Sequence, residues 1–424
     1  MKAVIIAAGS GTRMYPLTVT TPKLLLPVLS VPLLSWFVHN LKGLVDEIVI
    51  VINDKDSGNQ IRTYVHSHEF TVPIKFAVQS EQKGTAHAMQ IAQEALADDD
   101  SFLVMNGDDL YSRKDIESVI AAGPGLVGTP VNDPEKWGII TRDGAGKFTG
   151  LIEKPSDAEP GSLANIGLYH FNSSIFDIYD SVPESPRGEY EITDSVSLFA
   201  KSNDFSVIES NGDWYPIGYP WHLLEVNEKL VANTSGIDTF LLEHGYTRVD
   251  QQTDLSTLET QGIKIENGTV IKDVIYVKKG THVKAPSYFE GVSILDEDVI
   301  VGPFAYIRGT STLGRGAKVG ASEVKNAVIF SETKLPHFNY FGDGIAGNDV
   351  NFGVGSVVTN LRHDNEPVKT LIKGQLVSTG RRKFSAVIGD GVRLGAGTVI
   401  YPGRKLWPGV FTLPNSVISD DVTE

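Results

Sequence analysis

The sequence predicts two domains of different fold class: an α/β domain with a Rossmann-like, mostly parallel sheet, followed by a left-handed parallel β-helix of hexapeptide repeats. Two observations predict this division. Up to about residue 225, short apolar runs alternate with helical patterns, whereas from residue 265 apolar residues recur every six positions. The length of 424 residues agrees, because domains usually hold about 100–200 residues. We expect the domains to cover residues 1–250 and 251–424.

In the first domain, an apolar strand at residues 2–8 is expected to end in a glycine-rich turn. Further strands are expected at 47–52, 74–78 and 102–105, and helices at 33–44, 60–67, 85–96 and 223–231. Unbroken apolar strands that alternate with helices are typical of a parallel sheet covered on both faces. Ligands of such sheets bind beyond the carboxyl ends of the strands, so the residues after each strand are the candidate site residues.

In the second half, ten consecutive positions six residues apart are apolar: Ile265, Ile271, Val277, Val283, Phe289, Leu295, Val301, Ile307, Leu313 and Val319. The frame then slips and resumes in a new phase at Tyr340, Ala346, Phe352 and Val358, and later at Ile388, Leu394, Ile400 and Leu406. A period of six with turn glycines is the signature of a left-handed β-helix, and it excludes an amphipathic helix. The breaks at 320–339 and 359–387 are either tolerated surface insertions or functional loops.

The composition excludes several classes of function. The net charge of −15 argues against binding to nucleic acid or to an anionic membrane surface. The chain has no cysteine, so disulfides, thiolate nucleophiles and zinc–thiolate sites are excluded. The first residues lack an export signal, and the most apolar stretch is broken by Pro27 and Pro32. We therefore expect a cytoplasmic protein that acts on small molecules.

Two motifs of the first domain follow predicted strands. Gly9, Gly11, Arg13 and Lys23 lie in or after the first turn, where glycines let backbone N–H groups approach phosphate and two cations offset charge at an attacked phosphorus centre. Asp108 follows the strand at 102–105, a suitable place for a Mg²⁺ ligand. Each motif alone could also be a simple tight turn.

Together these segments resemble the sugar-phosphate nucleotidylyltransferases. The matching segments are GSGTRMYPLT (9–18), PK (22–23), GTAH (84–87), NGDD (106–109), EKP (153–155) and NIG (165–167). The resemblance implies that a sugar 1-phosphate attacks the α-phosphate of a nucleoside triphosphate and pyrophosphate leaves. It leaves UTP and dTTP, and glucose and N-acetylglucosamine, as alternatives.

The resemblance also implies roles for single residues. Arg13 and Lys23 would be catalytic, and Asp108 would hold Mg²⁺. Nucleotide binding would fall to Gly9, Gly11, Thr12, Gln79, Gly84 and Thr85, and sugar-phosphate binding to Gly138, Glu153, Lys154 and Asn165. One position departs from the family pattern, because Pro216 stands where a second metal-binding acid is usual, and the nearby Asp213 would point to the opposite face of a strand. Nucleotidyl transfer could therefore be weakened or lost.

The breaks in the hexapeptide period hold a second set of polar residues. His337 lies among polar side chains in the first break, and histidine is suited to take a proton near neutral pH. These residues resemble the acetyltransferase half of the bifunctional enzymes that make UDP-N-acetylglucosamine, in particular the archaeal type. That resemblance implies His337 as general base, and a sugar-phosphate site at Arg308, Lys325, Tyr340 and Asn351.

The same resemblance places the co-substrate acetyl-CoA beside Asn360 and Ala396, and such β-helices usually form homotrimers or dimers of trimers with sites between chains. Arg381, Arg382 and Lys383 form the strongest basic cluster. We interpret them as ligands of the CoA phosphates, although such a charge run is equally explained as a solvated loop. The alternatives to a bifunctional enzyme are a nucleotidylyltransferase with a scaffolding β-helix and an acetyltransferase that has lost nucleotidyl transfer.

Overall fold

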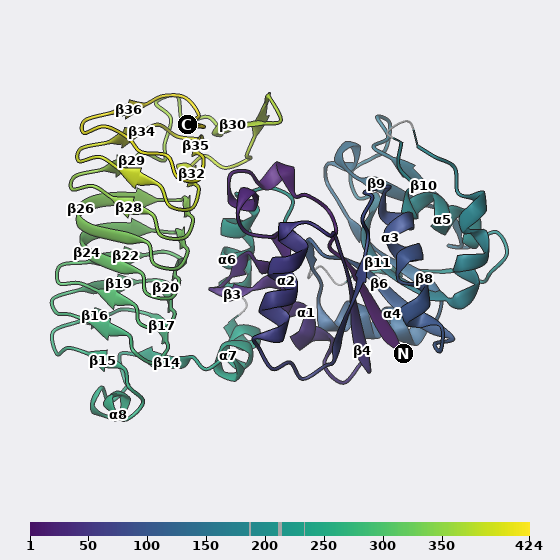
Figure 1. Ribbon diagram of the computed structural model, residues 1–424, viewed down its shortest axis with the longest axis horizontal. Coiled ribbons are helices and arrows are strands. Elements are labelled where there is room, and N and C mark those ends of the chain that lie inside the picture. Colours follow the sequence, from purple (N-terminus) through teal and green to yellow (C-terminus); the bar gives the residue numbers. More distant parts are fainter. Residues whose placement is uncertain (186–187, 211–213, 233) are drawn as a thin grey trace. The chain divides into compact units, whose positions relative to one another are not determined.

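The computed structural model describes residues 1–185, 188–210, 214–232 and 234–424 (Figure 1), so Asp213 lies outside the described residues. It divides into two compact units. The first comprises Met1–Ser10, Pro22–Leu25 and Leu33–Pro216, and the second comprises Gly11–Thr21, Leu26–Pro32 and Ile217–Glu424. The segment that carries Gly11, Thr12 and Arg13 thus belongs with the second unit.

The first unit is built on a nine-stranded sheet whose main path runs β10-β9-β11-β6-β1-β4-β5. Its strands are β1 (Lys2–Ile6), β4 (Glu47–Ile52), β5 (Ile74–Val78), β6 (Ser101–Asn106), β8 (Gly125–Pro130), β9 (Gly138–Arg142), β10 (Phe148–Glu153), β11 (Leu163–Asn172) and β12 (Ser206–Glu209). The four strands expected from sequence, β1, β4, β5 and β6, are parallel neighbours, while β11 joins β6 antiparallel. The prediction of a mostly parallel sheet is confirmed for this half of the sheet.

The helices of the first unit are α1 (Leu33–Leu41), α2 (Asp56–His66), α3 (Thr85–Ile91), α4 (Arg113–Ala122) and α5 (Ile192–Phe199). The helix expected at 85–96 ends at Ile91 and continues as a short 3₁₀ turn, Gln93–Leu96. The buried faces of α3 and α5 contribute Met89 and Val196 to one apolar core that also contains Val4 of β1 and Val104 of β6. Two short strands, β7 (Asp109–Leu110) and β13 (Tyr215–Pro216), pair with each other.

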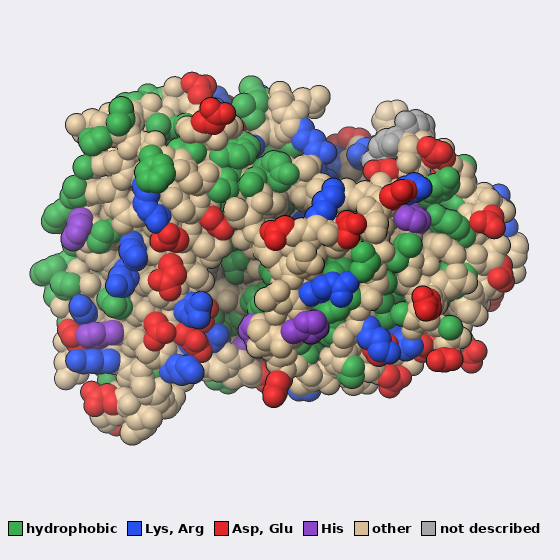
Figure 2. Space-filling view, in the orientation of Figure 1, with side chains coloured by type: hydrophobic (Ala, Val, Ile, Leu, Met, Phe, Trp, Pro, Cys, Tyr) green, Lys and Arg blue, Asp and Glu red, His purple; other side chains and the backbone are tan. Residues whose placement is uncertain are grey.

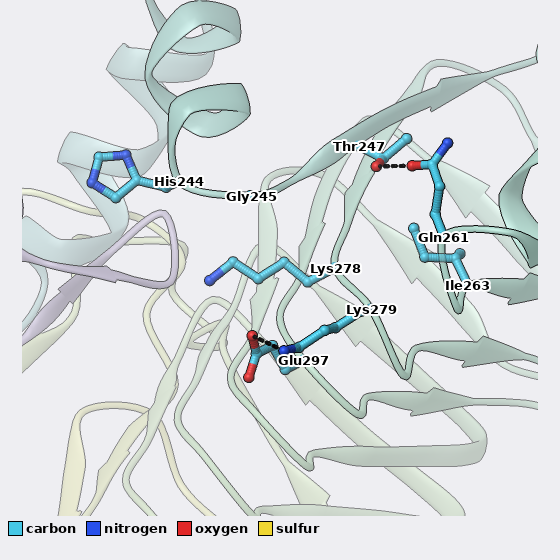
Figure 3. A pocket seen from close by; sticks show the side chains of 8 residues that line it. All are labelled: His244, Gly245, Thr247, Gln261, Ile263, Lys278, Lys279 and Glu297. Atoms are coloured by element: carbon cyan, nitrogen blue, oxygen red, sulfur yellow. Dashed lines mark hydrogen bonds and ion pairs between the residues drawn. The ribbon is translucent and has the colours of Figure 1, made fainter. Parts of the chain in front are cut away.

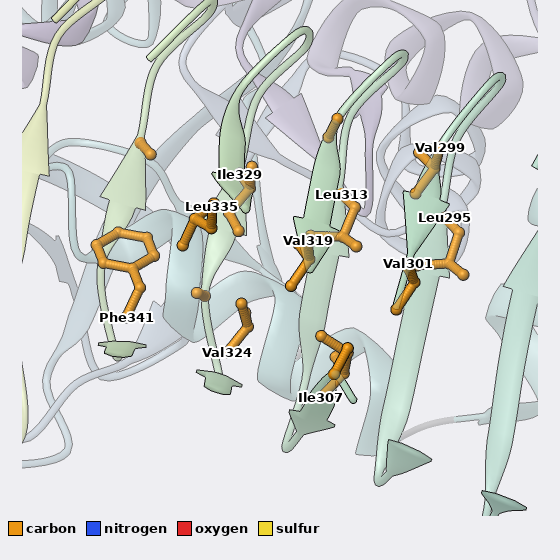
Figure 4. Close-up of a cluster of buried hydrophobic side chains, with 14 of the residues drawn as sticks. Leu295, Val299, Val301, Ile307, Leu313, Val319, Val324, Ile329, Leu335 and Phe341 are labelled. Carbon is orange, nitrogen blue, oxygen red and sulfur yellow. The ribbon is translucent and has the colours of Figure 1, made fainter. Parts of the chain in front are cut away.

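The second unit contains the parallel β-helix. Its coils comprise β15 (Lys264–Ile265), β16 (Val270–Ile271), β17 (Val274–Val277), β18 (His282–Val283), β19 (Tyr288–Glu290), β20 (Val292–Leu295), β21 (Ile300–Val301), β22 (Tyr306–Arg308), β23 (Ser311–Leu313), β24 (Lys318–Lys325), β25 (Val328–Ile329), β26 (Lys334–Gly342), β27 (Ile345–Ala346), β28 (Asn351–Phe352), β29 (Val357–Val358), β32 (Ala386–Ile388), β33 (Arg393–Leu394), β34 (Val399–Ile400), β35 (Arg404–Leu406) and β36 (Val417–Ile418). The ten apolar positions of the first frame all lie in its core, and Figure 4 shows successive inward side chains stacked from coil to coil.

The frame slips because the inward residues Val319, Val324 and Ile329 follow one another at five positions instead of six. After Val319, the inward residues are Val324, Ile329, Leu335 and Phe341. The strands β24 and β26 are unusually long, and between Ala321↔His337 and Glu323↔Tyr340 their pairing shifts by one residue. The extra residue lies in β26, where Phe338 has a φ of 51°. The prediction that Tyr340 is an inward position was therefore wrong: Phe341 fills the core, and Tyr340 is only half-buried.

The other elements of the second unit precede the β-helix strands along the chain or interrupt them. The second break in the period contains a hairpin of β30 (Lys369–Ile372) and β31 (Gln375–Ser378). Before the β-helix lie β2 (Pro27–Val28), β3 (Val31–Pro32), α6 (His222–Ala232), α7 (Thr234–Glu243), β14 (Thr247–Asp250) and α8 (Ser256–Glu259). Because β14 pairs with β17, the sheet of the β-helix begins within the segment that the sequence left without structure. None of the helices in the described part of the chain is long and apolar enough to span a membrane.

Candidate functional site

The loops at the carboxyl ends of the parallel strands are tied together in the first unit. The carbonyl oxygen of Ala8, after β1, accepts hydrogen bonds from Asn53 Nδ2 (3.0 Å) and from Gln82 Nε2 (2.8 Å). Asn53 follows β4, a position at which sequence reasoning named no site residue. A Cβ added to Gly9 would meet nothing within 4 Å, so the backbone of the predicted phosphate loop is open to a ligand at that residue.

Gln79, Gly84 and Thr85, the predicted base-reading residues, lie together. Gln79 is buried after β5 and its amide donates to the Gly84 carbonyl at 3.1 Å. Gly84 has a φ of 95°, and an added Cβ would lie 2.4 Å from the Tyr190 carbonyl oxygen. Thr85 begins α3, and its hydroxyl accepts from the backbone N–H of Ile192 at 2.9 Å. A glycine is therefore required at position 84 for packing, whatever it binds.

Lys23 and Asp108, the predicted catalytic cation and metal ligand, are in direct contact. Lys23 Nζ lies 2.6 Å from Asp108 Oδ2, and their side chains are 13% and 35% exposed. The neighbouring Asp109 is buried, and this burial, together with the charge of Asp108, raises the pKa of its carboxyl well above the usual value. Asp108 is thus the accessible carboxylate of the pair.

The candidate metal site depends on the carboxylate of Asp108. β13 places Pro216 directly opposite Asp109 on β7, so the position of the usual second acid supplies no side-chain oxygen. No group of three or more metal-binding side chains occurs in the described ranges of the chain. Mg²⁺ commonly uses one or two carboxylates and completes its shell with water and substrate phosphates. Asp108 fits that single-carboxylate pattern.

The predicted sugar-phosphate residues line β9, β10 and β11. The register pairs Gly138 with Glu153, and a Cβ on Gly138 would lie 3.1 Å from Glu153 Oε2. Lys154 Nζ is 3.7 Å from Glu153 Oε1, and both side chains are exposed. Asn165 Nδ2 donates to the Tyr169 hydroxyl at 2.7 Å, and its Oδ1 accepts from the Gly167 backbone at 3.1 Å. The amide of Asn165 is therefore held in one orientation.

The Gly11–Arg13 segment is held by contacts within the second unit. Gly11 has a φ of 61° and precedes a short 3₁₀ turn, Thr12–Met14. Its carbonyl accepts from the Thr18 hydroxyl at 2.8 Å, and the Arg13 guanidinium carbon lies 5.5 Å from the centre of the Tyr219 ring. Thr20 donates to Asp390 Oδ2 at 2.9 Å, so residues of the β-helix half help to hold the predicted nucleotide loop.

His337 lies on β26, next to the extra residue in the pairing of this strand with β24. Its side chain is exposed, its backbone N–H donates to Asn339 Oδ1 at 3.2 Å, and its carbonyl accepts from Gly355. Asn339 is buried and bonds Ser322 on the preceding coil. The backbone at His337 is therefore fixed while its ring faces outward, as a general base for an external substrate requires.

Two of the other predicted acetyl-transfer residues, Lys325 and Asn360, meet at Asp343, a residue for which the sequence predicted no role. Asp343 Oδ2 accepts from Lys325 Nζ and from Asn360 Nδ2, both at 2.6 Å, and Oδ1 accepts from Asn326 Nδ2 at 3.0 Å. Asn360 also donates to the Tyr340 hydroxyl at 3.0 Å. The side chain of Asp343 is 4% exposed. The sequence signal that could have indicated Asp343 as a partner of Lys325 is its place one coil further along the chain.

The remaining predicted residues of the second unit lie further along the coils. The guanidinium of Arg308 forms an ion pair with Glu323 at 2.6 Å. Asn351 begins β28 half-buried, and Ala396 is exposed in the turn after Gly395.

The basic cluster does not form one surface. Arg381 makes two hydrogen bonds to Glu228, at 2.6 and 2.9 Å, and its side chain is 15% exposed. Arg382 instead donates to Asn365 Oδ1 at 3.2 Å, and Lys383 bridges Leu361 through the backbone. The guanidinium of Arg381 is therefore engaged within the protein.

A cavity of about 350 Å³ in the second unit lies apart from these residues (Figure 3). Its lining includes His244, Gln261, Lys278 and Glu297. The ammonium group of Lys278 forms an ion pair with Asp296 at 2.9 Å. Acidic and basic side chains are interspersed on the visible face (Figure 2).

Comparisons with known proteins agree with both halves of the chain. The nucleotidyl transferase family model matches residues 2–233. The whole chain is 33% identical to a "Bifunctional sugar-1-phosphate nucleotidylyltransferase/acetyltransferase" of Sulfurisphaera tokodaii, 98% of which is covered. It is also 33% identical to two proteins named "Bifunctional protein GlmU", from Methanococcus vannielii and Methanocaldococcus jannaschii, each covered to 96%. The chain therefore belongs to the nucleotidyl transferase family and, over its full length, to the bifunctional sugar-1-phosphate nucleotidylyltransferases/acetyltransferases.

Proposed function

We propose that this enzyme makes a UDP-amino sugar in two steps. Residues 251–424 transfer acetyl from acetyl-CoA to glucosamine 1-phosphate, and residues 1–250 then join the product to a uridylyl group from UTP. The observation that carries the proposal is that one chain holds two separate sets of polar residues. Lys23 contacts Asp108 in the first; in the second, Lys325 and Asn360 meet at Asp343, and His337 is exposed on β26 of the same unit.

In the nucleotidyl-transfer step, the sugar phosphate oxygen attacks the α-phosphorus, and the bond to pyrophosphate breaks. Lys23 and Arg13 offset the negative charge that develops at phosphorus. Asp108 would hold Mg²⁺, which supplies further positive charge to the phosphates. Glu153 and Asn165 orient the sugar, and Lys154 binds its phosphate.

In the acetyl-transfer step, the sugar amine attacks the thioester carbonyl, a C–N bond forms, and the C–S bond breaks to release CoA thiol. His337 takes the proton that the amine loses. Lys325 and Arg308 bind the sugar phosphate, while Tyr340 and Asn351 orient the ring. Asn360 and Ala396 lie along the acetyl-CoA channel.

A second candidate function follows from Pro216. Its place opposite Asp109 removes a usual ligand, and this favours an acetyltransferase whose nucleotidyl transfer is weak or lost. The experiment is to supply glucosamine 1-phosphate with acetyl-CoA and follow free thiol, and then to supply UTP or dTTP with Mg²⁺ and follow pyrophosphate. Release of both products supports the bifunctional enzyme. Thiol without pyrophosphate supports the second candidate, and pyrophosphate without thiol reduces the β-helix to a scaffold.

A homotrimer, or a dimer of trimers, would complete the acetyl-transfer site. Backbone hydrogen bonds connect successive turns at one corner of the β-helix. They join His337 to Gly355, Val354 to Gly397, and Ala396 to Asn415. Exposed apolar side chains follow this corner: Phe338 (73%), Val354 (49%) and Leu413 (78%). Such a ridge is suited to a protein interface. Light scattering after size-exclusion chromatography should give three or six chains, and a monomer would contradict this assembly.

A further inference from the structure

Glu228 of α6 contacts two residues of the β-helix half at once. Its Oε1 accepts from Asn326 Nδ2 at 2.6 Å and from Arg381 at 2.6 Å, and its Oε2 accepts a second bond from Arg381 at 2.9 Å. The Glu228 side chain is 35% exposed, while Arg381 is largely buried. Charge-assisted, two-point pairs of this kind fix geometry as well as charge.

Asn326 extends this contact to the acetyl-transfer residues. The same Nδ2 that donates to Glu228 donates its other hydrogen to Asp343 Oδ1 at 3.0 Å. A primary amide has two N–H donors on one nitrogen, and here each is used by one carboxylate. Without Glu228, the amide is free to turn its oxygen toward Asp343, which would replace an attractive contact with a repulsive one.

The charges around this amide are balanced in two pairs. Asp343 is neutralised by Lys325 and Glu228 by Arg381, each across 2.6 Å. Asp343 also acts electrostatically on Arg381. If Glu228 loses its charge, Arg381 is left as a largely buried cation that still interacts with Glu225 and Asp343, and its pull on Asp343 is then opposed by one acid fewer.

We infer that Glu228 is a positioning residue for acetyl transfer: through Asn326 and Arg381 it holds Asp343, which in turn sets Lys325 and Asn360. This inference rests on the proposed acetyl-transfer function. In this inference, Arg381 helps to position Lys325, the proposed ligand of the sugar phosphate, and does not bind the CoA phosphates.

The test compares Glu228→Gln with wild type in the thiol-release assay, varying each substrate in turn. We expect KM for glucosamine 1-phosphate to rise about tenfold, the size expected when one hydrogen bond between charged groups is lost. KM for acetyl-CoA should stay within about twofold. Asn326→Ser breaks the same connection from its other end and should give the same pattern. Glu297→Gln removes an acid that pairs with Lys279 at 3.8 Å, and serves as the matched control without effect.

Two results would overturn the inference. One is a rise in KM for acetyl-CoA alone, which would return Arg381 to CoA binding. The other is unchanged constants in both variants, or equal losses in acetyl and nucleotidyl transfer with a lower melting temperature, which would leave Glu228 a purely structural role. Absence of thiol release by the wild-type enzyme would instead contradict the proposed function itself. If Glu228→Gln fails to fold, Asn326→Ser decides between these results, because it keeps the Glu228–Arg381 pair.

Discussion

The two units arrange their polar side chains in different ways. In the first unit, residues far apart in sequence meet because parallel strands end at one edge of a sheet, as Ala8 after β1 and Asn53 after β4 do. In the second unit, they meet because successive coils stack in register, so that Lys325 pairs with Gly342 beside Asp343. Sheet topology therefore brings the first set together, whereas the stacking of neighbouring coils brings the second set together.

The same contrast applies to stability. Each coil of a repeat protein contacts only its neighbours, and substitutions there should act on adjacent coils. In the first unit, β1 lies between β4 and β6, so its core is shared among segments distant in sequence.

Replacement of His337 by Ala should lower the acetyl-transfer kcat by about 10²–10⁴-fold, because a general base contributes that much. Pyrophosphate release should be unchanged, since His337 lies on β26 of the β-helix and takes no part in the proposed nucleotidyl transfer. Both rates can be measured on one preparation. Equal acetylation by the variant and the wild type would reject the assignment of the base.

Replacement of Lys23 by Ala should reduce nucleotidyl transfer by about 10²–10³-fold, the usual loss when one group that stabilises a charged transition state is removed. Thiol release should not change. Lys75→Ala is the matched control, because Lys75 also pairs with an acid, Glu47 at 2.8 Å, but is 63% exposed. A Lys23 variant with normal pyrophosphate release would contradict the proposed site.

A Cβ at Gly320 should destabilise the β-helix at its first break. The added atom would lie 2.1 Å from the Pro336 carbonyl oxygen on the next coil, and overpacking of this kind costs about 1–3 kcal/mol. Gly320→Ala should therefore lower the melting temperature. Gly144→Ala, where a Cβ meets nothing within 4 Å, should leave it unchanged, and equal melting of both variants would show that the coils separate easily here.

The smallest expected effect is the contribution of His170 in the first unit to the pH dependence of stability. Burial lowers the pKa of His170, which lies on β11 beside the Val119 carbonyl. A histidine with a lowered folded pKa binds a proton more readily when unfolded, so stability is lost as pH falls through the ordinary value near 6.5. Urea midpoints at pH 7 and pH 5 should differ less in His170→Gln than in wild type. An identical pH dependence would exclude this histidine as a source of acid sensitivity.

Sequence patterns predicted the first unit's strands well because buried parallel strands are unbroken apolar runs; the strand expected at 47–52 has the same bounds as β4. The rule that ligands bind beyond strand ends predicted the glycine turn after β1 and Asp108 after β6 as site candidates, whereas the other candidates of this unit came from the family resemblance. Asn53 was missed because its role is to hold the Ala8 carbonyl, and such support has no motif.

In the second unit, the period of six predicted the core but failed where the period itself changes. One extra residue in β26 moved Phe341 inward in place of Tyr340. Arg381 was interpreted as a CoA ligand because composition shows a cation but not its partner. Its partner, Glu228, lies 153 positions away in sequence, and no local pattern joins the two.

Complementation between two inactive variants shows whether the two active sites work independently. His337→Ala and Lys23→Ala are each supplied with glucosamine 1-phosphate, acetyl-CoA, UTP and Mg²⁺, alone and mixed, and UDP-N-acetylglucosamine is measured. We predict almost no product from either variant alone and near-normal product from the mixture, since N-acetylglucosamine 1-phosphate can pass from one protein to the other. A mixture that stays inactive, or either variant that makes the product alone, would contradict the claim of two separate sites.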